Sequence, residues 1–324
     1  MDNIEPLVSV VLPVYNRPTV VDTIASVLNQ TYSNYELIII DNASTDNTVE
    51  KINEIGDSRI RVFVNEENKG QTYSINRGLE LSKGKYIARI DADDLMVSER
   101  LEKQVKFLED NPDFGLVGSW VQYITLSNKK AFVVKMPISD KGMRIMQTIA
   151  CGMFHPAAML RKSLLDEYKI TYDSNMMMAE DYDMWRKIMQ YSKALNLPEV
   201  LTLYRKGDND SVRHADIMHK ECCSIRKVVC ENELKGSIHL NKMQEIIEIE
   251  DKNKKNLLDI IKICSFYKDY ILTELGDTED FNILMIHIRL KIYSDIAANN
   301  NTLYARFFVF VYKFLKKIRY VIGK

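Results

Sequence analysis

The sequence predicts an α/β protein, with a mostly parallel central sheet flanked by helices, followed by a helical C-terminal region. Short apolar runs alternate with amphipathic helical segments as far as about Trp120. Such alternation requires crossover connections between parallel strands. After Asp216 the chain becomes polar and carries apolar residues at helical intervals.

The same patterns divide the chain into domains. The stretch from Ser127 to Arg213 is less regular and contains more loop than the chain before it. We therefore expect a first domain at 1–215, with halves at about 1–120 and 121–215, and a helical region at 216–324.

The first strand is continuously apolar, as expected for a parallel strand that helices cover on both faces. We expect Pro13 to end it, because proline lacks a backbone N–H. The predicted strands, in chain order, are Leu7–Leu12, Tyr35–Ile40, Ile60–Val64, the run from Tyr86 into Asp91, and Gly115–Trp120. The predicted helices begin near Thr19, after the turn Asn42–Asp46, at Gly70 and near Ser98.

Composition excludes several classes of protein. The net charge is −1, so the chain as a whole gives no electrostatic case for nucleic acid. Five cysteines without a CxxC pair are typical of a reduced, intracellular protein rather than of a disulfide framework or zinc site. The start of the chain is acidic and does not resemble a secretory signal, and no run reaches the ~20 apolar residues of a spanning helix. We expect a cytoplasmic protein.

The fourth predicted strand ends in three carboxylates, those of Asp91, Asp93 and Asp94. Carboxylates this close repel one another, and a divalent cation relieves the repulsion most directly. In α/β sheets ligands bind beyond the carboxyl ends of the strands, which is where this cluster lies. The alternative is an acidic turn that caps the next helix.

Two other strand ends carry polar residues at the same edge. No glycine-rich turn follows the first strand, which argues against a dehydrogenase, and no P-loop motif occurs. Tyr15 can instead stack on a flat ring such as a nucleobase. Asp41 can accept a hydrogen bond from the ring N–H of uracil, or it can cap the turn Asn42–Ser44.

Together, these motifs resemble family 2 glycosyltransferases with the GT-A fold, which is Rossmann-like. The resemblance covers about the first two-thirds of the chain, and the order and spacing of the motifs carry it. The matching segments are Val8–Asn16, Asp41–Asp46, Asn68–Gly70, Asn76–Gly78 and Asp91–Asp94.

The resemblance implies a nucleotide sugar as donor, usually a UDP-sugar, a Mn²⁺ or Mg²⁺ ion, and transfer with inversion. It implies a role for each matching side chain. Pro13, Tyr15 and Asn16 would form the base and ribose cradle, Asp41 the uracil partner, Asp91 a ribose or sugar contact and further metal ligand, Asp93 the main metal ligand, and Arg77 a nucleotide contact.

Glu180 and Asp181 resemble the Glu-Asp pair that this family places at the start of a helix beside the acceptor. By resemblance, Asp181 would be the general base and Glu180 would orient it or contact the donor sugar. The alternative is a solvated acidic first turn, which the helix dipole favours. Trp185 follows one helical turn later, where we expect it to pack in the core.

Two further segments resemble family motifs. His155 would touch the donor diphosphate or the acceptor, with a structural histidine as the alternative. Tyr204-Arg205 resembles a Tyr-Arg motif that the family follows with a histidine, but Gly207 occupies that position here. Arg205 or Arg213 would contact the diphosphate. The missing histidine leaves a third protein ligand for the metal open, and His214 would substitute for it only if the loop folds back.

The tail at 303–322 is apolar, aromatic and basic, with no acidic residue. It suits a helix that lies on an anionic membrane surface. We therefore expect a peripheral protein on the inner face of the bacterial cell membrane. The alternative is that this helix packs on the protein or on a second subunit, and a homo-oligomer stays open.

We predict an inverting glycosyltransferase that acts on a polysaccharide or a lipid-linked saccharide. Two alternatives have the same α/β pattern: a sugar nucleotidyltransferase, and a glycan-assembly subunit that has lost its chemistry. The sugar transferred, the acceptor and the linkage are not encoded in any residue that we recognise.

Overall fold

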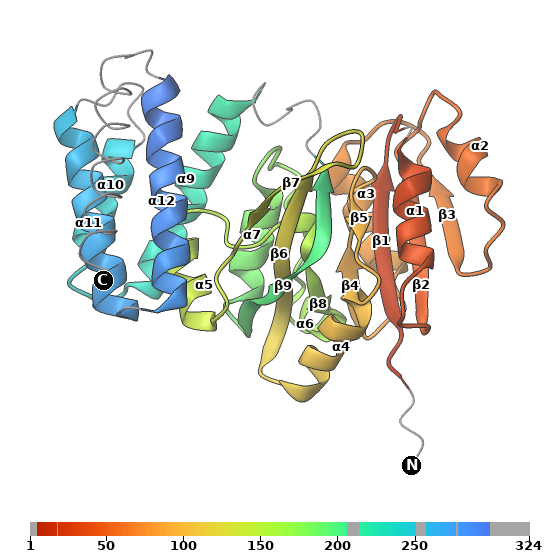
Figure 1. Ribbon diagram of the computed structural model, residues 1–324, viewed down its shortest axis with the longest axis horizontal. Helices are drawn as coiled ribbons and strands as arrows, with labels where there is room; N and C mark the ends of the chain where they lie inside the picture. Colours follow the sequence, from red (N-terminus) through yellow and green to blue (C-terminus); the bar gives the residue numbers. More distant parts are fainter. Residues whose placement is uncertain (1–4, 18, 206–213, 251–256, 277, 299–324) are drawn as a thin grey trace. The chain divides into compact units, whose positions relative to one another are not determined.

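The computed structural model describes residues 5–17, 19–205, 214–250, 257–276 and 278–298. The chain divides into two compact units, Met1–Val229 and Cys230–Lys324. The first unit contains the sheet and all predicted site residues (Figure 1).

The strands of the first unit form one curved sheet. Its order is β3-β2-β1-β4-β8-β6-β9-β5, with β7 paired to β6 outside this path. The strands are β1 (Val8–Val14), β2 (Tyr35–Asp41), β3 (Ile60–Val64), β4 (Tyr86–Arg89), β5 (Leu95–Met96), β6 (Phe114–Ile124), β7 (Lys130–Val134), β8 (Met159–Arg161) and β9 (Lys193–Arg205).

Parallel pairing dominates the first half of the sheet and mixed pairing the second. Strands β1 to β4 pair only in parallel with one another, as expected. Beyond them β8 is antiparallel to β4 and β6, while β6 and β9 are parallel. The predicted α/β class, with helices flanking a sheet, is confirmed.

Helices connect and flank these strands (Figure 1). They are α1 (Val20–Leu28), α2 (Thr48–Asn53), α3 (Gln71–Leu81), α4 (Arg100–Asp110), α5 (Asp140–Gln147), the short 3₁₀ helix η1 (His155–Ala157), α6 (Lys162–Tyr168), α7 (Glu180–Ile188) and α9 (Ala215–Glu233). Every residue of β1 is buried, which explains its continuous apolar run. The inner face of α1, formed by Val20, Ile24 and Val27, packs in the same core.

The prediction that Pro13 ends the first strand is wrong, because β1 continues through Pro13 to Val14. Val14 accepts a hydrogen bond on the β2 side, and Val11 accepts one from Ile90 on the β4 side. By alternation Pro13 faces β4, whose ladder with β1 ends at Val11. The missing N–H of Pro13 therefore costs no ladder hydrogen bond.

The border between the two units lies further along the chain than the expected border at 215/216. Helix α9 crosses the expected border, and most of it, as far as Val229, belongs to the first unit. The reason is packing, since Ile225 and Val229 are buried against Ala179 and Tyr182.

The described residues of the second unit contain the helices α10 (Leu240–Glu250), α11 (Leu257–Leu275) and α12 (Glu279–Ala298). Within the described part of the chain, no helix combines the length and the apolar character needed to cross a bilayer. The basic tail at 303–322 lies outside the described residues.

Candidate functional site

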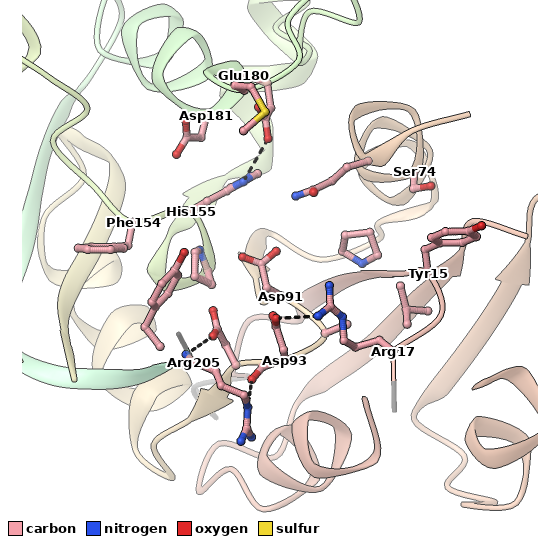
Figure 2. Close-up of a pocket in the computed structure, with 18 of the residues that line it drawn as sticks. Tyr15, Arg17, Ser74, Asp91, Asp93, Phe154, His155, Glu180, Asp181 and Arg205 are labelled. Carbon is pink, nitrogen blue, oxygen red and sulfur yellow. Dashed lines mark hydrogen bonds and ion pairs between the residues drawn. The ribbon is translucent and has the colours of Figure 1, made fainter. Parts of the chain in front are cut away.

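A cavity of about 900 Å³ opens at the carboxyl ends of β1 and β4. Most of the predicted site residues line it (Figure 2). They are Pro13, Tyr15, Asp91, Asp93, His155, Glu180, Asp181 and Arg205. Asn16, Asp41 and Arg77 do not line this cavity.

The acidic turn after β4 lies at the centre of the cavity (Figure 2). Arginines partly neutralise it: Arg89 Nη2 lies 2.6 Å from Asp91 Oδ1, and Arg17 Nη1 lies 3.3 Å from Asp93 Oδ2. Burial and the charge of Asp91 raise the pKa of Asp93. Burial, with the charges of Asp91 and Asp93, raises the pKa of Asp94 well above its usual range. The carboxyl groups of Asp93 and Asp94 are therefore harder to ionise than exposed ones, because of burial first and of the neighbouring charges second.

The donor set of this turn fits a hard divalent cation. Among the described residues no group of three His, Cys, Asp or Glu side chains is arranged to hold a metal. Mg²⁺ needs only one or two protein carboxylates when substrate phosphates supply the other oxygens, and Mn²⁺ prefers the same ligands. Asp94 Oδ2 is buried without a hydrogen-bond partner among the described residues, so the turn offers an unpaired oxygen.

The far end of the cavity is suited to a flat, polar ligand. Tyr15, which follows β1, is 42% exposed there. Asn42, Gln71 and Ser74 add polar groups, the last two from the start of α3. The segment around Tyr15 is shaped by Asn16, whose backbone takes the left-handed conformation at φ 43°.

Asn16 braces a loop rather than facing the cavity. Its Oδ1 accepts a hydrogen bond from Thr45 N at 2.8 Å, and its own backbone N–H donates to Ser44 Oγ at 2.9 Å. Asn16 therefore fixes the segment that carries Tyr15. Its predicted role in the base and ribose cradle stays a prediction.

Asp41 is fully buried and caps the following turn, as its alternative role predicts. Both of its carboxylate oxygens accept from Ser44, one from the backbone N–H at 2.9 Å and one from the hydroxyl. Arg77 is also engaged elsewhere, since it donates to Val64 O and Asn65 Oδ1. The nucleotide contacts of Asp41 and Arg77 stay predictions.

Glu180 and Asp181 begin α7, facing the acidic turn across the cavity (Figure 2). Glu221, on α9, accepts hydrogen bonds from the backbone N–H groups of Met177, Met178 and Ala179 at 2.9–3.0 Å. This contact fixes the segment that leads into α7, and sequence periodicity gave no sign of it.

The two α7 carboxyl groups are hard to ionise. Burial raises the pKa of Asp181 to about 6. Burial, with the charge of Asp181, raises the pKa of Glu180 to about 8. Asp181 Oδ1 accepts from Tyr182 N at 2.7 Å, and the Cys151 thiol donates to Asp181 Oδ2 at 3.7 Å. A carboxylate with a pKa near the working pH is suited to proton transfer.

His155 lies between the acidic turn after β4 and the carboxyl pair of α7. Burial and the charge of Arg89 lower the pKa of its imidazole well below the usual value. Its Nε2 shares a hydrogen bond with Tyr172 Oη at 2.9 Å, and its Nδ1 lies 4.0 Å from Glu180 Oε1. A neutral His155 cannot supply positive charge, and at 4.0 Å it makes no hydrogen bond to Glu180. Buried Arg100 holds the 3₁₀ helix of His155, donating to Pro156 O and Ala158 O.

Arg205 is buried and binds protein groups. Its side chain donates from Nε to Asp93 O at 2.6 Å, and its backbone N–H donates to Asp94 Oδ1 at 2.7 Å. It therefore supports the acidic turn from behind. Trp185 is fully buried, as expected, and donates to Met153 O at 3.3 Å.

Four aromatic side chains form a wall of the cavity that the sequence did not predict. Tyr123 and Phe132 stack with ring centroids 4.7 Å apart, and Tyr204 lies 5.0 Å from Tyr123 and 5.3 Å from Phe154. All four line the cavity. Such a wall offers flat apolar surface to a sugar ring or an alkyl chain.

Comparison with known proteins agrees with this geometry. The family described as "Glycosyl transferase family 2" matches residues 9–169. An uncharacterized glycosyltransferase of Haemophilus influenzae is 31% identical over 269 residues, covering 80% of this chain and 81% of the relative. WfgD of Escherichia coli, a UDP-Glc:alpha-D-GlcNAc-diphosphoundecaprenol beta-1,3-glucosyltransferase, is 31% identical over 61% of this chain and 77% of its own.

A solved structure shares the fold. The crystal structure of S. aureus TarS 1-349 in complex with UDP-GlcNAc superimposes with a TM-score of 0.60. The likeness covers 90% of this chain and 89% of that one at 17% sequence identity.

Proposed function

Since the chain belongs to glycosyl transferase family 2, and is therefore a glycosyltransferase, we propose that it transfers a sugar from a UDP-sugar to a hydroxyl group of a polysaccharide or lipid-linked saccharide, with inversion. One observation carries the proposal. A single cavity brings the acidic turn after β4 and the carboxyl pair of α7 to facing sides (Figure 2).

The UDP moiety would occupy the side of the cavity at Tyr15. Tyr15 would stack on the uracil, and the polar residues Asn42 and Ser74 line the same part of the cavity. Arg17 lies beside Asp93 with 45% of its side chain exposed, so it can exchange this contact for a donor phosphate.

Asp93, with Asp91 beside it, would hold Mn²⁺ or Mg²⁺. The cation, when bound, supplies positive charge against the negative charge that grows on the departing UDP. Arg89 and Arg205 would keep the two carboxylates in place, through the contact with Asp91 and through Asp93 O.

Asp181 would act as the general base. As the acceptor oxygen forms its bond to the anomeric carbon, the bond from that carbon to the β-phosphate oxygen breaks. The hydroxyl proton passes to Asp181, and the electron pair of the broken bond leaves with UDP. Attack from the face opposite UDP produces inversion.

Glu180, with its raised pKa, would retain its proton near neutral pH and donate a hydrogen bond to the donor sugar or to the base. This arrangement keeps the two neighbouring groups from both being charged.

The aromatic wall would receive the acceptor. A lipid-linked acceptor is supported by the relative WfgD, which acts on a diphosphoundecaprenol-linked sugar. Such a substrate would place the enzyme at the inner face of the cell membrane.

UDP release from a panel of UDP-sugars, measured with Mn²⁺ and with EDTA, tests the proposal. The panel holds glucose, galactose, their N-acetyl forms and glucuronic acid, each with and without undecaprenyl diphosphate-linked N-acetylglucosamine. We expect metal-dependent release from one donor, faster with acceptor. Failure of the protein to bind UDP at any metal concentration would overturn the proposal.

A further inference from the structure

The hairpin formed by β6 and β7 projects apolar side chains into solvent. Every residue from Thr125 to Val133 is exposed. The exposed fractions are 72% for Leu126, 57% for Phe132 and 43% for Val133. One exposed apolar residue is ordinary at a protein surface, but this short hairpin carries three, of which the strand neighbours Phe132 and Val133 point to opposite faces. We call these three residues the hairpin patch.

Positive charge surrounds the hairpin patch. Lys129, Lys130 and Lys135 lie on the same hairpin, and no Asp or Glu occurs between Val121 and Ser139. Lys129 and Lys130 are exposed. Apolar side chains interleaved with lysines are the composition that binds at the boundary of an anionic bilayer.

The hairpin is held firmly beside the cavity. Asn128 turns the chain with φ 60° and donates to Thr125 O at 2.9 Å. Arg205 binds this turn through Leu126 O at 3.1 Å and Asn128 Oδ1 at 2.6 Å, and the same side chain donates to Asp93 O. The hairpin patch therefore has a fixed place relative to the acidic turn.

One residue of the hairpin, Phe132, is exposed to solvent and also lines the cavity. Phe132 belongs both to the hairpin patch and to the aromatic wall, where it stacks on Tyr123. A molecule that leaves a surface bound to the hairpin patch would meet the aromatic wall next.

We propose that the β6–β7 hairpin docks on an anionic lipid bilayer, with Leu126 and Val133 in the headgroup boundary and the lysines on lipid phosphates. Strand addition by a partner protein is disfavoured, because lysines on an edge strand oppose such pairing. The inference rests on the proposed function in one respect, since a lipid-linked acceptor would then emerge beside the cavity.

Tryptophan quenching at a chosen position tests the proposal on the full chain. Leu126→Trp is compared with Val64→Trp, which also replaces an exposed apolar residue but lies near exposed Glu66 and Glu67. Both variants keep the two native tryptophans as the same background. Vesicles contain brominated phosphatidylglycerol or brominated phosphatidylcholine.

We expect the indole introduced by Leu126→Trp to be quenched in phosphatidylglycerol vesicles, and that introduced by Val64→Trp to stay unquenched. Adding Lys129→Ser and Lys130→Ser to Leu126→Trp should raise the lipid concentration for half-quenching about tenfold or more, since each lysine near the surface is worth ~1 kcal/mol.

Equal quenching of the two indoles, or vesicle binding without quenching at position 126, would overturn the proposal, since another part of the chain would then make the contact. Capture of a protein partner with no vesicle binding would do the same. Neither donor nor turnover enters this measurement. Its failure therefore leaves the proposed function standing, and failure of UDP release leaves the hairpin proposal standing.

Discussion

Replacing Glu180 by glutamine should stabilise the protein at neutral pH. Glu180 is 8% exposed, and burial raises its pKa from 4.5 to about 8. The unfolded chain releases this proton above pH 4.5, whereas the folded chain retains it. Because the folded-state pKa is the higher one, the contribution of Glu180 to stability is greatest below pH 4.5 and falls as the pH rises towards about 8.

The magnitude follows from the same two pKa values. At pH 7 this loss of stability is at most ~3.5 kcal/mol, because each pH unit above 4.5 and below the folded-state pKa is worth about 1.4 kcal/mol. Glutamine keeps the shape of the protonated side chain and does not ionise. Glu180→Gln should therefore remove most of this loss, while lowering turnover.

Urea unfolding at pH 7 and at pH 4.5, followed by tryptophan fluorescence, measures the effect. Both tryptophans, Trp120 and Trp185, lie in the first unit and report on it. We expect a gain of ~1–3 kcal/mol at pH 7 that shrinks towards zero at pH 4.5. Exposed Glu80 supplies the control, since Glu80→Gln should change stability by no more than ~0.5 kcal/mol. A Glu180→Gln protein that is less stable at pH 7 would refute the reasoning.

Three further predictions follow from the site and its support. The kcat/KM of the wild type should fall about tenfold per pH unit below about 6, because the Asp181 carboxyl, with its pKa of about 6, must be ionised to accept a proton; a flat profile down to pH 5 would exclude this base. Asp93→Asn should abolish the metal dependence of UDP affinity in calorimetry, whereas Asp110→Asn, on exposed Asp110, should preserve it. Gly84→Ala should lower stability by ~1–3 kcal/mol, because its Cβ would lie 2.6 Å from Ser9 N and 2.7 Å from Leu7 O, both backbone atoms; an unchanged melting temperature would contradict this.

The positions of the first four strands found in the sequence and the acidic turn were predictable because each is a local signal. Apolar runs of strand length mark β1 to β4, and the abrupt change from Ile90 to Asp91 marks the carboxyl end of one of them. The motif of Glu180 and Asp181 was found through its resemblance to a family pattern and not through periodicity.

The aromatic wall was not predictable, because its members come from separate segments that only the folded sheet brings together. Tyr123 and Tyr204 become neighbours through the pairing of β6 with β9, and no pattern in the sequence encodes this register. Similarly, the sequence left two partners open for Asp41, a uracil ring and the turn that follows it. Burial and the nearby Ser44 hydroxyl favoured the local one.

The ion pair of Arg17 with Asp93 was missed for a related reason. Arg17 follows β1 and Asp93 follows β4, so their contact depends on the adjacency of two strands that are distant in sequence. Sequence reasoning located the acids but not the cations that accompany them.

The central claim is that the carboxyl pair of α7 performs chemistry while the β1 and β4 side of the cavity binds the nucleotide. Asp181→Asn tests this division most directly, by turnover with the best donor and by UDP affinity in the same buffer. We expect the kcat of the Asp181→Asn protein to fall ~100-fold or more, and its UDP affinity to stay within about threefold of that of the wild type. Turnover within a few-fold of wild type, or a parallel loss of UDP binding, would contradict it.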